Sequence, residues 1–495
     1  MKQQGIQKLF LEKKILSKLM LSSRKSLLLT LGLTLSYNVM AQQKNVLFIA
    51  VDDLKPIGGC YDRPEVKTPN MDLLAQTGFV FKNNHCQQAV CAPTRASLLT
   101  GKRPDYTQIW DLKTQIRDMN PDIRTMPQYF KEKGYQTAAV GKVFDLRSVD
   151  SQHDSLSWSK PYVSMKSSNV TGGGYIHETK RVSTECADVP DSVTLDGRVV
   201  AESIQLLDEL STDEQPFFLA VGFHKPHLPF VAPKKYWDLY DRDQIQLASY
   251  REKPIGAPGY ASQPGWEVRS QYDDVPKDFK VPISEEKQKE LIHGYYACVS
   301  FIDQQIGNLI AYLDEKGLRQ NTVIVLWGDH GWHLGDHDMW CKHTNYEQAT
   351  RSPLMVALGD NYIGQSSSPT EFVDVFPTLC QLAGVETPND IDGLSLVPLI
   401  TGELTSLKPH AVSQFHRNKV LMGYAFRNER YRYIIWLKDN YRSNQPYRSE
   451  LIDAEELYDY TLDPLETTNQ ATNPEYSSIR QEMLEKAIQF FKEQQ

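Results

Sequence analysis

The stretch Asn45-Val-Leu-Phe-Ile-Ala-Val51, followed directly by Asp52-Asp53, decides the fold class of this 495-residue chain. Its six consecutive apolar residues, bounded by polar ones, predict a strand that is buried on both faces. Three further runs share this character: Thr137–Val140, Phe217–Val221 and Thr322–Trp327. Helical patterns separate these runs, and the alternation predicts an α/β fold in which helices flank a mostly parallel central sheet.

The clearest helical pattern covers Tyr295–Lys316, where apolar residues fall on one face and Gly317 follows as a stop signal. Residues 251–282 are rich in Pro, Gly and Tyr and show no periodicity. They predict a long loop, and loops of this length are often functional.

The character of the sequence changes beyond about residue 410. Tyr431–Trp436 and Glu456–Tyr460 predict strands, and Ser477–Lys492 predicts an amphipathic helix. We therefore expect a main domain over residues 42–410 and a small C-terminal α+β subdomain over residues 411–495.

The N-terminus has the order of a secretory signal peptide. Residues 1–25 carry seven Lys or Arg and one acid, an apolar run covers residues 26–36, and Val39-Met-Ala41 offers a small-residue cleavage site. We expect residues 1–41 to be removed and the protein to be secreted or periplasmic. The apolar run is too short to span a bilayer and no later stretch is long enough, so we expect no membrane span after removal.

The charge balance argues against nucleic acid as a partner. The formal net charge is −8, and it becomes −14 without residues 1–41, which hold seven basic residues and one acidic residue. Binding to a phosphate backbone requires clustered cations, which an acidic exported protein lacks. If the substrate is an anion, the cations that bind it must be gathered in a local pocket.

Charged side chains follow each of the four predicted strands. In open α/β sheets, ligands bind beyond the carboxyl ends of the strands, so these side chains are expected to meet. The strands end in these segments: Asp52-Asp53, Gly141-Lys142, Gly222-Phe-His224-Lys-Pro-His227-Leu-Pro229 and Gly328-Asp329-His330. A single Asp-Asp after a strand is more often a solvated turn, but four such ends together favour a site.

The residues at these strand ends, together with Lys342 further along the chain, divide into two sets according to the ion that they would bind. Asp52, Asp53 and Asp329, with His330 beside them, offer hard oxygen ligands, which favour Ca²⁺ or Mg²⁺ over Zn²⁺. The second set, Lys142, His227 and Lys342, suits a bound oxyanion.

The sharpest local feature is Cys91-Ala-Pro-Thr-Arg95-Ala-Ser-Leu-Leu-Thr-Gly101. It predicts a helix over Thr94–Thr100, with Pro93 in the first turn and Gly101 as its end. Cys91 would face the helix N-terminus, where backbone amides favour an anion, and Arg95 would lie near the same face. The alternative is a structural cysteine or half of a disulfide. The chain has seven cysteines and no CxxC pair, so at least one thiol is unpaired or chemically altered.

Cys91-x-Pro-x-Arg95 followed by Leu99-Thr-Gly101 resembles the signature of the Cys-type sulfatases. The resemblance covers about residues 45–470. It implies an alkaline-phosphatase/sulfatase-like fold for the main domain, which would be catalytic. It also implies that a formylglycine-generating or sulfatase-maturating enzyme oxidises Cys91 to formylglycine. A divalent cation, Ca²⁺ in preference to Mg²⁺, would then be bound by these residues: Asp52, Asp53, the modified Cys91, Asp329 and His330.

The same resemblance implies roles for the remaining charged residues. Arg95, Lys142 and Lys342 would stabilise the charge that develops on the sulfate, and His227 would protonate the departing sugar oxygen. The competing interpretations are a phosphatase or phosphodiesterase of the same superfamily and a non-catalytic binder of sulfated glycans. The phosphatases and phosphodiesterases use Ser or Thr nucleophiles. A non-catalytic binder would be expected to lack principal catalytic residues.

The stretches Phe217–Pro229, Asp329–Trp332 and Lys342–Asn345 resemble the iduronate-2-sulfatase branch of this family. This resemblance implies a sulfated oligo- or polysaccharide substrate, either of the glycosaminoglycan type or of the ulvan type. Asp145 departs from that branch, which commonly has His there, so we leave Asp145 out of the catalytic set. His224 and Trp332 are the candidates for binding the sugar. Weaker candidates near the site are these: His333, His343, Tyr424 and Arg427.

Overall fold

The computed structural model describes residues 43–165, 175–176, 181–359, 361–438 and 447–493. The predicted signal peptide over residues 1–41 lies outside these ranges. Residues 44–495 form one compact unit. The expected boundary between the main domain and the C-terminal subdomain, after residue 410, therefore stays a prediction. Within the described residues, no helix is both long enough and apolar enough to cross a membrane.

The central sheet confirms the predicted α/β class. Its described strands, in spatial order, are β12 (Gly364–Ser366), β2 (Phe79–Phe81), β11 (Leu354–Leu358), β8 (Thr322–Gly328), β1 (Asn45–Val51), β6 (Phe217–Phe223) and β4 (Gln136–Gly141). The four strands predicted from sequence, β8, β1, β6 and β4, are neighbours and run parallel. Only β11 pairs antiparallel with its neighbours β8 and β2. The carboxyl ends of the four parallel strands therefore meet at one edge.

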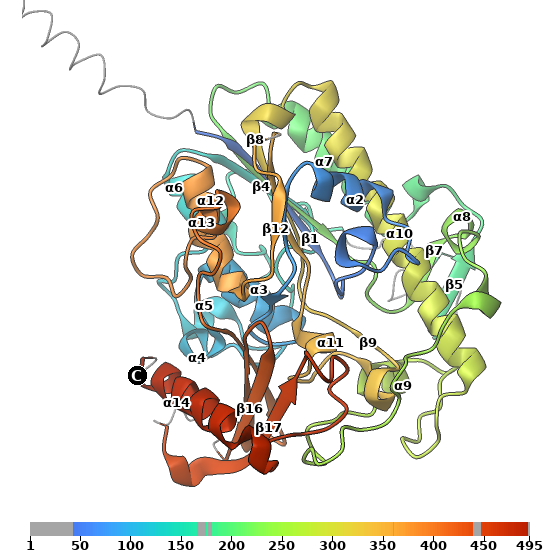
Figure 1. Ribbon diagram of the computed structural model, residues 1–495. Helices are drawn as coiled ribbons and strands as arrows, with labels where there is room; N and C mark the ends of the chain where they lie inside the picture. Colours follow the sequence, from blue (N-terminus) through green and yellow to red (C-terminus); the bar gives the residue numbers. More distant parts are fainter. Residues whose placement is uncertain (1–42, 166–174, 177–180, 360, 439–446, 494–495) are drawn as a thin grey trace, which may run out of the picture. The chain divides into compact units, whose positions relative to one another are not determined.

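Strand β1 is buried on both faces, as its unbroken apolar sequence predicts. Leu47 and Ile49 pack into one core and Val46 and Phe48 into the other, because successive side chains of a strand point to opposite faces. The first core includes side chains of α2 (Pro69–Gln76), α7 (Leu195–Leu210) and α10 (Glu285–Glu315). The second includes side chains of α3 (Cys91–Thr100), α6 (Met126–Glu132) and α12 (Val375–Leu382). Figure 1 shows these two sets of helices on opposite sides of the sheet.

Two helices differ from the sequence prediction. Helix α10 begins at Glu285 rather than Tyr295, because the Ser284 side chain accepts a hydrogen bond from the Lys287 amide and caps the helix. The predicted loop over residues 251–282 contains a short helix, α9 (Trp266–Gln271). A helix of 6 residues is too short to show the helical period, which explains why periodicity missed it.

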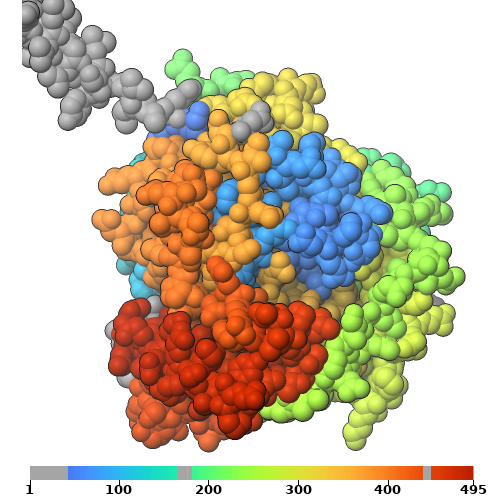
Figure 2. Space-filling model, viewed as in Figure 1, coloured from blue at the N-terminus to red at the C-terminus, as the bar shows by residue number. Residues whose placement is uncertain are grey.

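The C-terminal part is an antiparallel sheet covered by one helix. Its strands are β14 (Ala411–Arg417), β15 (Leu421–Arg427), β16 (Tyr431–Leu437) and β17 (Ile452–Asp459). Helix α14 (Ser477–Glu493), predicted to within one residue, packs against this sheet through Met483, Ala487 and Phe491. Figure 2 shows the C-terminal residues, in red, beside the green loop that precedes α10. The Tyr260 hydroxyl in that loop bonds Asp453 of β17 at 2.5 Å.

Shorter elements connect these layers. The short strands are β3 (Asn84–His85), β5 (Thr184–Ala187), β7 (Phe230–Pro233), β9 (His333–Leu334), β10 (Trp340–Cys341) and β13 (Thr370–Glu371). The short α-helices are α4 (Pro104–Thr107), α5 (Ile116–Met119), α8 (Lys234–Trp237), α11 (Glu347–Thr350) and α13 (Val397–Ile400).

The end of β6 leaves no space for a side chain. A β-carbon on Gly222 would lie 2.1 Å from the carbonyl carbon of Lys142. We predict that Gly222→Ala displaces Lys142 and lowers the free energy of unfolding by roughly 1–3 kcal/mol, measured by urea denaturation. Gly259→Ala is the control, because a β-carbon there meets no atom within 4 Å; it should change stability by less than about 0.5 kcal/mol. Equal denaturation midpoints for the two variants would contradict this packing argument.

Candidate active site

The edge formed by the four parallel strands brings the predicted residues together. In the register of β1 and β8, Val51 lies beside Gly328, so Asp52 and Asp329 are neighbours just beyond the sheet. The Asp53 amide donates to Asp329 Oδ1 at 2.9 Å. All three acidic residues are buried, with at most 1% of their surface exposed. The expected convergence of strand ends is therefore observed.

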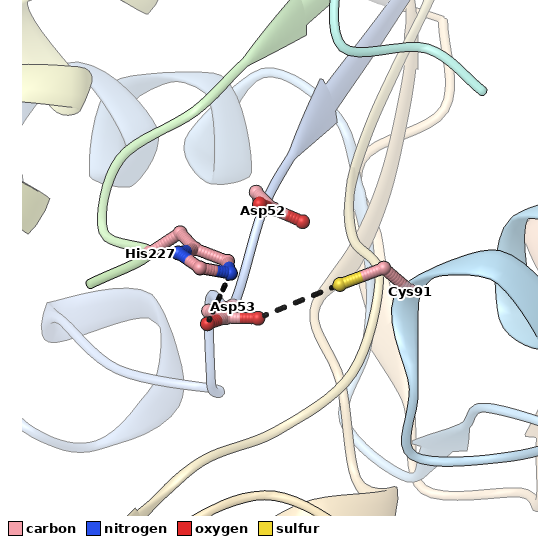
Figure 3. Close-up of side chains that lie close together, drawn as sticks. All are labelled: Asp52, Asp53, Cys91 and His227. Carbon is pink, nitrogen blue, oxygen red and sulfur yellow. Dashed lines mark hydrogen bonds and ion pairs between the residues drawn. The ribbon is translucent and has the colours of Figure 1, made fainter. Parts of the chain in front are cut away.

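Cys91 is the first residue of α3 and lies at the centre of this edge. Its Sγ is 4.0 Å from Asp53 Oδ1, 3.5 Å from His330 Nε2 and 3.5 Å from Lys342 Nζ (Figure 3 shows it facing Asp53). Burial, together with the charge of Asp52, raises the pKa of the thiol well above its ordinary value. Because nucleophilic cysteines require a depressed pKa, the unmodified thiol is poorly suited to attack a substrate. All seven cysteines are free, so the structural alternative of a disulfide at Cys91 is wrong.

Two overlapping groups of side chains could hold a metal ion. One comprises Asp53, Cys91, Asp329 and His330, and the other replaces the last two with Asp52 and His227. Asp53 Oδ2 is buried and accepts no hydrogen bond from the described residues. Burial and the charges of Asp52 and Asp53 raise the pKa of Asp329. Three buried carboxylates with one free oxygen fit a hard divalent cation.

Arg95 lies under this acidic cluster and is fully buried. Its Nε donates to Asp329 Oδ2 at 3.0 Å and its Nη2 to Asp52 Oδ1 at 3.1 Å. Its Nη1 donates to the carbonyls of Lys142 and Val143. All three guanidinium nitrogens of Arg95 thus bond to protein groups, and the side chain fixes the positions of Asp52 and Asp329; its expected part in stabilising charge on the sulfate stays a prediction.

Two lysines supply the positive charge that faces Cys91. Lys142 Nζ is 2.5 Å from Asp52 Oδ2, and Lys342 Nζ is 2.6 Å from Asp53 Oδ1. Although burial raises the pKa of Asp52, the charges of Lys142, His227 and Arg95 hold it well below its ordinary value. The Asp52 carboxylate therefore stays charged beside Lys142, and the two lysines are placed to attract an oxyanion.

His227 reaches the same site from the segment after β6, as predicted. Its Nε2 lies 3.8 Å from Asp53 Oδ2, and its Nδ1 bonds the Leu228 carbonyl at 2.6 Å (Figure 3). With 27% of its side chain exposed, it is among the more accessible groups of the site. Nε2 is therefore the ring nitrogen that faces Asp53 and the site.

Glu267 is a site residue that the sequence analysis missed. It lies on α9, and its carboxylate is 3.4 Å from His227 Nε2 and 3.6 Å from Lys342 Nζ. Despite burial, Lys342 and His227 lower the pKa of Glu267 to about 2. The only signal in the sequence was the long loop that contains it.

Several weaker candidates have other partners. Trp332 is 1% exposed, packs against Phe230 and lies under Lys342 Nζ, so its ring has no face free for a sugar. His224 remains partly exposed, and its Nδ1 lies 3.5 Å from Asp196, so its role as a sugar-binding residue stays a prediction. Asp145 pairs with Arg147.

The remaining candidates lie deeper in the protein. His333 bonds Thr344, and burial lowers its pKa to about 3. Burial has the same effect on His343, whose pKa also falls to about 3 although Glu267 raises it. Tyr424 donates to Asp105 at 2.6 Å, and Arg427 donates to Glu347 at 3.1 Å. Both are buried, and their bonds to Asp105 and Glu347 leave them no demonstrated part in the site.

A sulfatase family model matches residues 44–385, and a model described as the C-terminal part of N-sulphoglucosamine sulphohydrolase matches residues 335–494. The chain belongs to the sulfatase family. This sulfatase is 34% identical to human iduronate 2-sulfatase, over 90% of this chain and 94% of that protein. It is 31% identical to a sulfatase of Formosa agariphila, over 88% of this chain and 84% of that protein.

A solved structure supports the fold. An enzyme in complex with its substrate D-glucosamine-2-N,6-O-disulfate aligns with a TM-score of 0.73 at 21% identity, over 91% of this chain and 99% of that chain. The predicted alkaline-phosphatase/sulfatase-like architecture with a C-terminal subdomain is therefore confirmed.

The carboxylate cluster predicts stabilisation by a divalent cation. Adding Ca²⁺ to chelator-treated protein should raise its thermal unfolding midpoint, because the cation binds only the folded state; saturation at 100 times Kd contributes about 2.7 kcal/mol. Asp53→Asn should abolish most of this rise, whereas Asp390→Asn, which changes a carboxylate whose side chain is 70% exposed, should retain it. An equal rise in Asp53→Asn would place the cation elsewhere.

The lowered pKa of Glu267 predicts that the stability of the folded protein falls in acid. Because its pKa falls from 4.5 to about 2 on folding, it stabilises the protein above pH 4.5, and this contribution is lost as the pH falls toward 2. Unfolding midpoints measured across that range should fall less steeply for Glu267→Gln than for the unaltered protein. Glu252→Gln, an exposed change in the same loop, should keep the original slope. A Glu267→Gln slope as steep as the original would refute this assignment.

Proposed function

We propose that this sulfatase hydrolyses sulfate esters of saccharides through a formylglycine formed from Cys91. The single observation that carries the proposal is the placement of Cys91 between Asp53, His330 and Lys342, at the edge where the parallel strands end. A catalytic site at the carboxyl edge of the sheet also agrees with the general position of ligands in such folds.

The modified residue and the cation supply two parts of the chemistry. Hydrated formylglycine would provide the hydroxyl that attacks the sulfur atom. A divalent cation, Ca²⁺ in our proposal, would be held by Asp52, Asp53, Asp329 and His330 and would lower the energy of the negative charge near the nucleophile. The donor set of carboxylates with one imidazole supports Ca²⁺ or Mg²⁺ over a softer metal.

The protein's own cations complete the sulfate site. Lys142 and Lys342 are held by carboxylates at 2.5 and 2.6 Å, so their charges are preorganised before substrate arrives. Fixed charges aimed at a developing oxyanion stabilise the transition state without reorganisation. Arg95 maintains this arrangement by bridging Asp52 and Asp329.

His227 is the group that donates a proton to the departing sugar oxygen. Its Nδ1 proton is engaged by the Leu228 carbonyl, which leaves Nε2 to face Asp53 and Glu267. The Glu267 carboxylate lies 3.4 Å from Nε2 and fixes the direction of this edge of the ring. It therefore acts as a positioning residue for the acid.

The substrate class and the location of the protein are supported by similarity. The relatives include iduronate 2-sulfatase, and one aligned structure holds a sulfated glucosamine. We infer a sulfated glycosaminoglycan or ulvan-type oligosaccharide as substrate, and export through the signal peptide predicted over residues 1–41. A maturation enzyme of the formylglycine-generating type is the implied partner.

Cys91→Ser tests the nucleophile. The variant should fold normally but lose sulfate release by at least about a thousandfold, because serine cannot be oxidised by a cysteine-specific maturation enzyme and cannot release sulfate by aldehyde formation. Mass spectrometry of the tryptic peptide that contains residue 91 should show the aldehyde only in unaltered protein produced with the maturation enzyme. Full turnover by folded Cys91→Ser protein would refute the mechanism.

Sulfate release measured by ion chromatography tests the reaction and its substrate. The matured enzyme should act on either glycosaminoglycan disaccharides with a 2-O-sulfated terminal uronate or ulvan-type oligosaccharides. 4-Nitrophenyl sulfate and 4-nitrophenyl phosphate form the matched pair for the reaction type. A clear preference for the phosphate ester would favour the phosphatase alternative.

A further inference from the structure

The segment that follows Lys142 forms a fixed turn beside the site. The Ser148 amide and hydroxyl both donate to the Asp145 carbonyl at 2.9 Å, and the Ile116 amide donates to the Ser148 carbonyl at 2.9 Å. The first carbonyls of the turn, those of Lys142 and Val143, accept hydrogen bonds from Arg95 Nη1. Its position relative to Cys91 is therefore set by the same guanidinium that orders the acidic cluster.

Asp145 is buried within this turn and holds Arg147. Its Oδ1 accepts hydrogen bonds from the Arg147 amide at 3.0 Å and from Nε at 2.9 Å, and its Oδ2 accepts from Nη2 at 2.7 Å. Only 1% of Asp145 is exposed. Its carboxylate is thus fully engaged and does not face an incoming sulfate, which resolves the difficulty that an acid at this position poses.

Arg147 exposes to solvent the part of its guanidinium that Asp145 does not bind. Its side chain is 53% exposed, and among the described residues nothing accepts a hydrogen bond from its Nη1. Arg147 lies five residues beyond Lys142, on the turn whose first carbonyls accept hydrogen bonds from Arg95. The hydrogen bond to Asp145 raises the pKa of Arg147, so its guanidinium stays charged. A buried acid therefore holds an accessible cation on the segment that directly follows Lys142.

We propose that Arg147 is a specificity residue that binds a second oxyanion of the substrate, either a carboxylate or a further sulfate, close to the scissile ester. The inference rests on the proposed function, since it concerns the saccharide that carries the ester. Arginine suits this task because its planar fork recognises carboxylate and sulfate oxygens in a fixed geometry. Asp145 orients the fork in advance, so little entropy is lost when the anion binds.

The charge arrangement explains why the substrate would be doubly anionic. Lys142 and Lys342 are paired with Asp52 and Asp53 and serve the sulfate that is removed. Arg147 is paired with a separate acid, Asp145, on the same strand connection. Two separate cationic positions favour a sugar with two anionic groups over one with a single sulfate.

The test compares saccharides that differ in one anionic group. The probes are a 2-O-sulfated uronate disaccharide, the same disaccharide with its carboxylate reduced to an alcohol, and the same disaccharide with an added 6-O-sulfate. 4-Nitrophenyl sulfate reports the basic reaction. In the unaltered enzyme, kcat/KM should be highest for the probes that retain the recognised anion.

Arg147→Gln should reduce the preference for the recognised anion. The ratio of kcat/KM for the probe that carries this anion to kcat/KM for the matched probe without it should fall by at least about tenfold, because a charge-assisted hydrogen bond is lost. A fall in the acid-to-alcohol ratio identifies a carboxylate, and a fall confined to the added 6-O-sulfate identifies a sulfate. Arg147→Lys, which retains the charge without the fork, should give an intermediate ratio. Arg124→Gln is the matched control, because its side chain is 43% exposed and pairs with Asp390 at 3.5 Å; it should leave both ratios unchanged.

Unchanged ratios in Arg147→Gln, together with normal turnover of 4-nitrophenyl sulfate, would overturn this proposal alone. Failure of the unaltered, matured enzyme to release sulfate from any of these probes and from ulvan-type oligosaccharides would instead overturn the proposed function, and this inference with it. Thermal unfolding midpoints of the variants confirm that they are folded.

Discussion

Arg95 and the carboxylates of Asp52 and Asp329 form the ionic cluster on which the site depends. All three are fully or almost fully buried, so each charge has lost its hydration and must be compensated by direct contacts. Removing the guanidinium would leave two carboxylates buried beside each other and also free the Lys142 and Val143 carbonyls. The arrangement of the lysines, the nucleophile and the turn after β4 therefore follows from this one side chain.

The C-terminal sheet and the loop before α10 complete the site from outside the central sheet. Arg432 of β16 joins the two parts, because it donates to the Asn345 carbonyl at 2.8 Å and pairs with Glu466 at 3.0 Å. The loop contacts β17 through Tyr260 and delivers Glu267 to His227. A group that orients the proposed acid thus comes from a segment whose position depends on the C-terminal part.

The turn at Asp145 shows how a substitution in an otherwise familiar site can be accommodated. An acid close to a bound sulfate would repel it, yet Asp145 is neutralised by Arg147 and buried beneath it. The net result is a neutral ion pair whose cationic member is exposed, rather than an unpaired anion in the site.

The sequence by itself determined the α/β class, the four parallel strands, the charged strand ends and a helix over Thr94–Thr100, which the structure extends back to Cys91. Strand periodicity and the residues that follow each strand are local properties, and parallel strands bring their ends together by necessity. Only the tertiary structure decided that Glu267 belongs to the site, that Trp332 is buried and that Arg95 bridges Asp52 and Asp329. These outcomes depend on contacts between residues far apart in the chain and on which side chains remain exposed, and neither is encoded in local spacing.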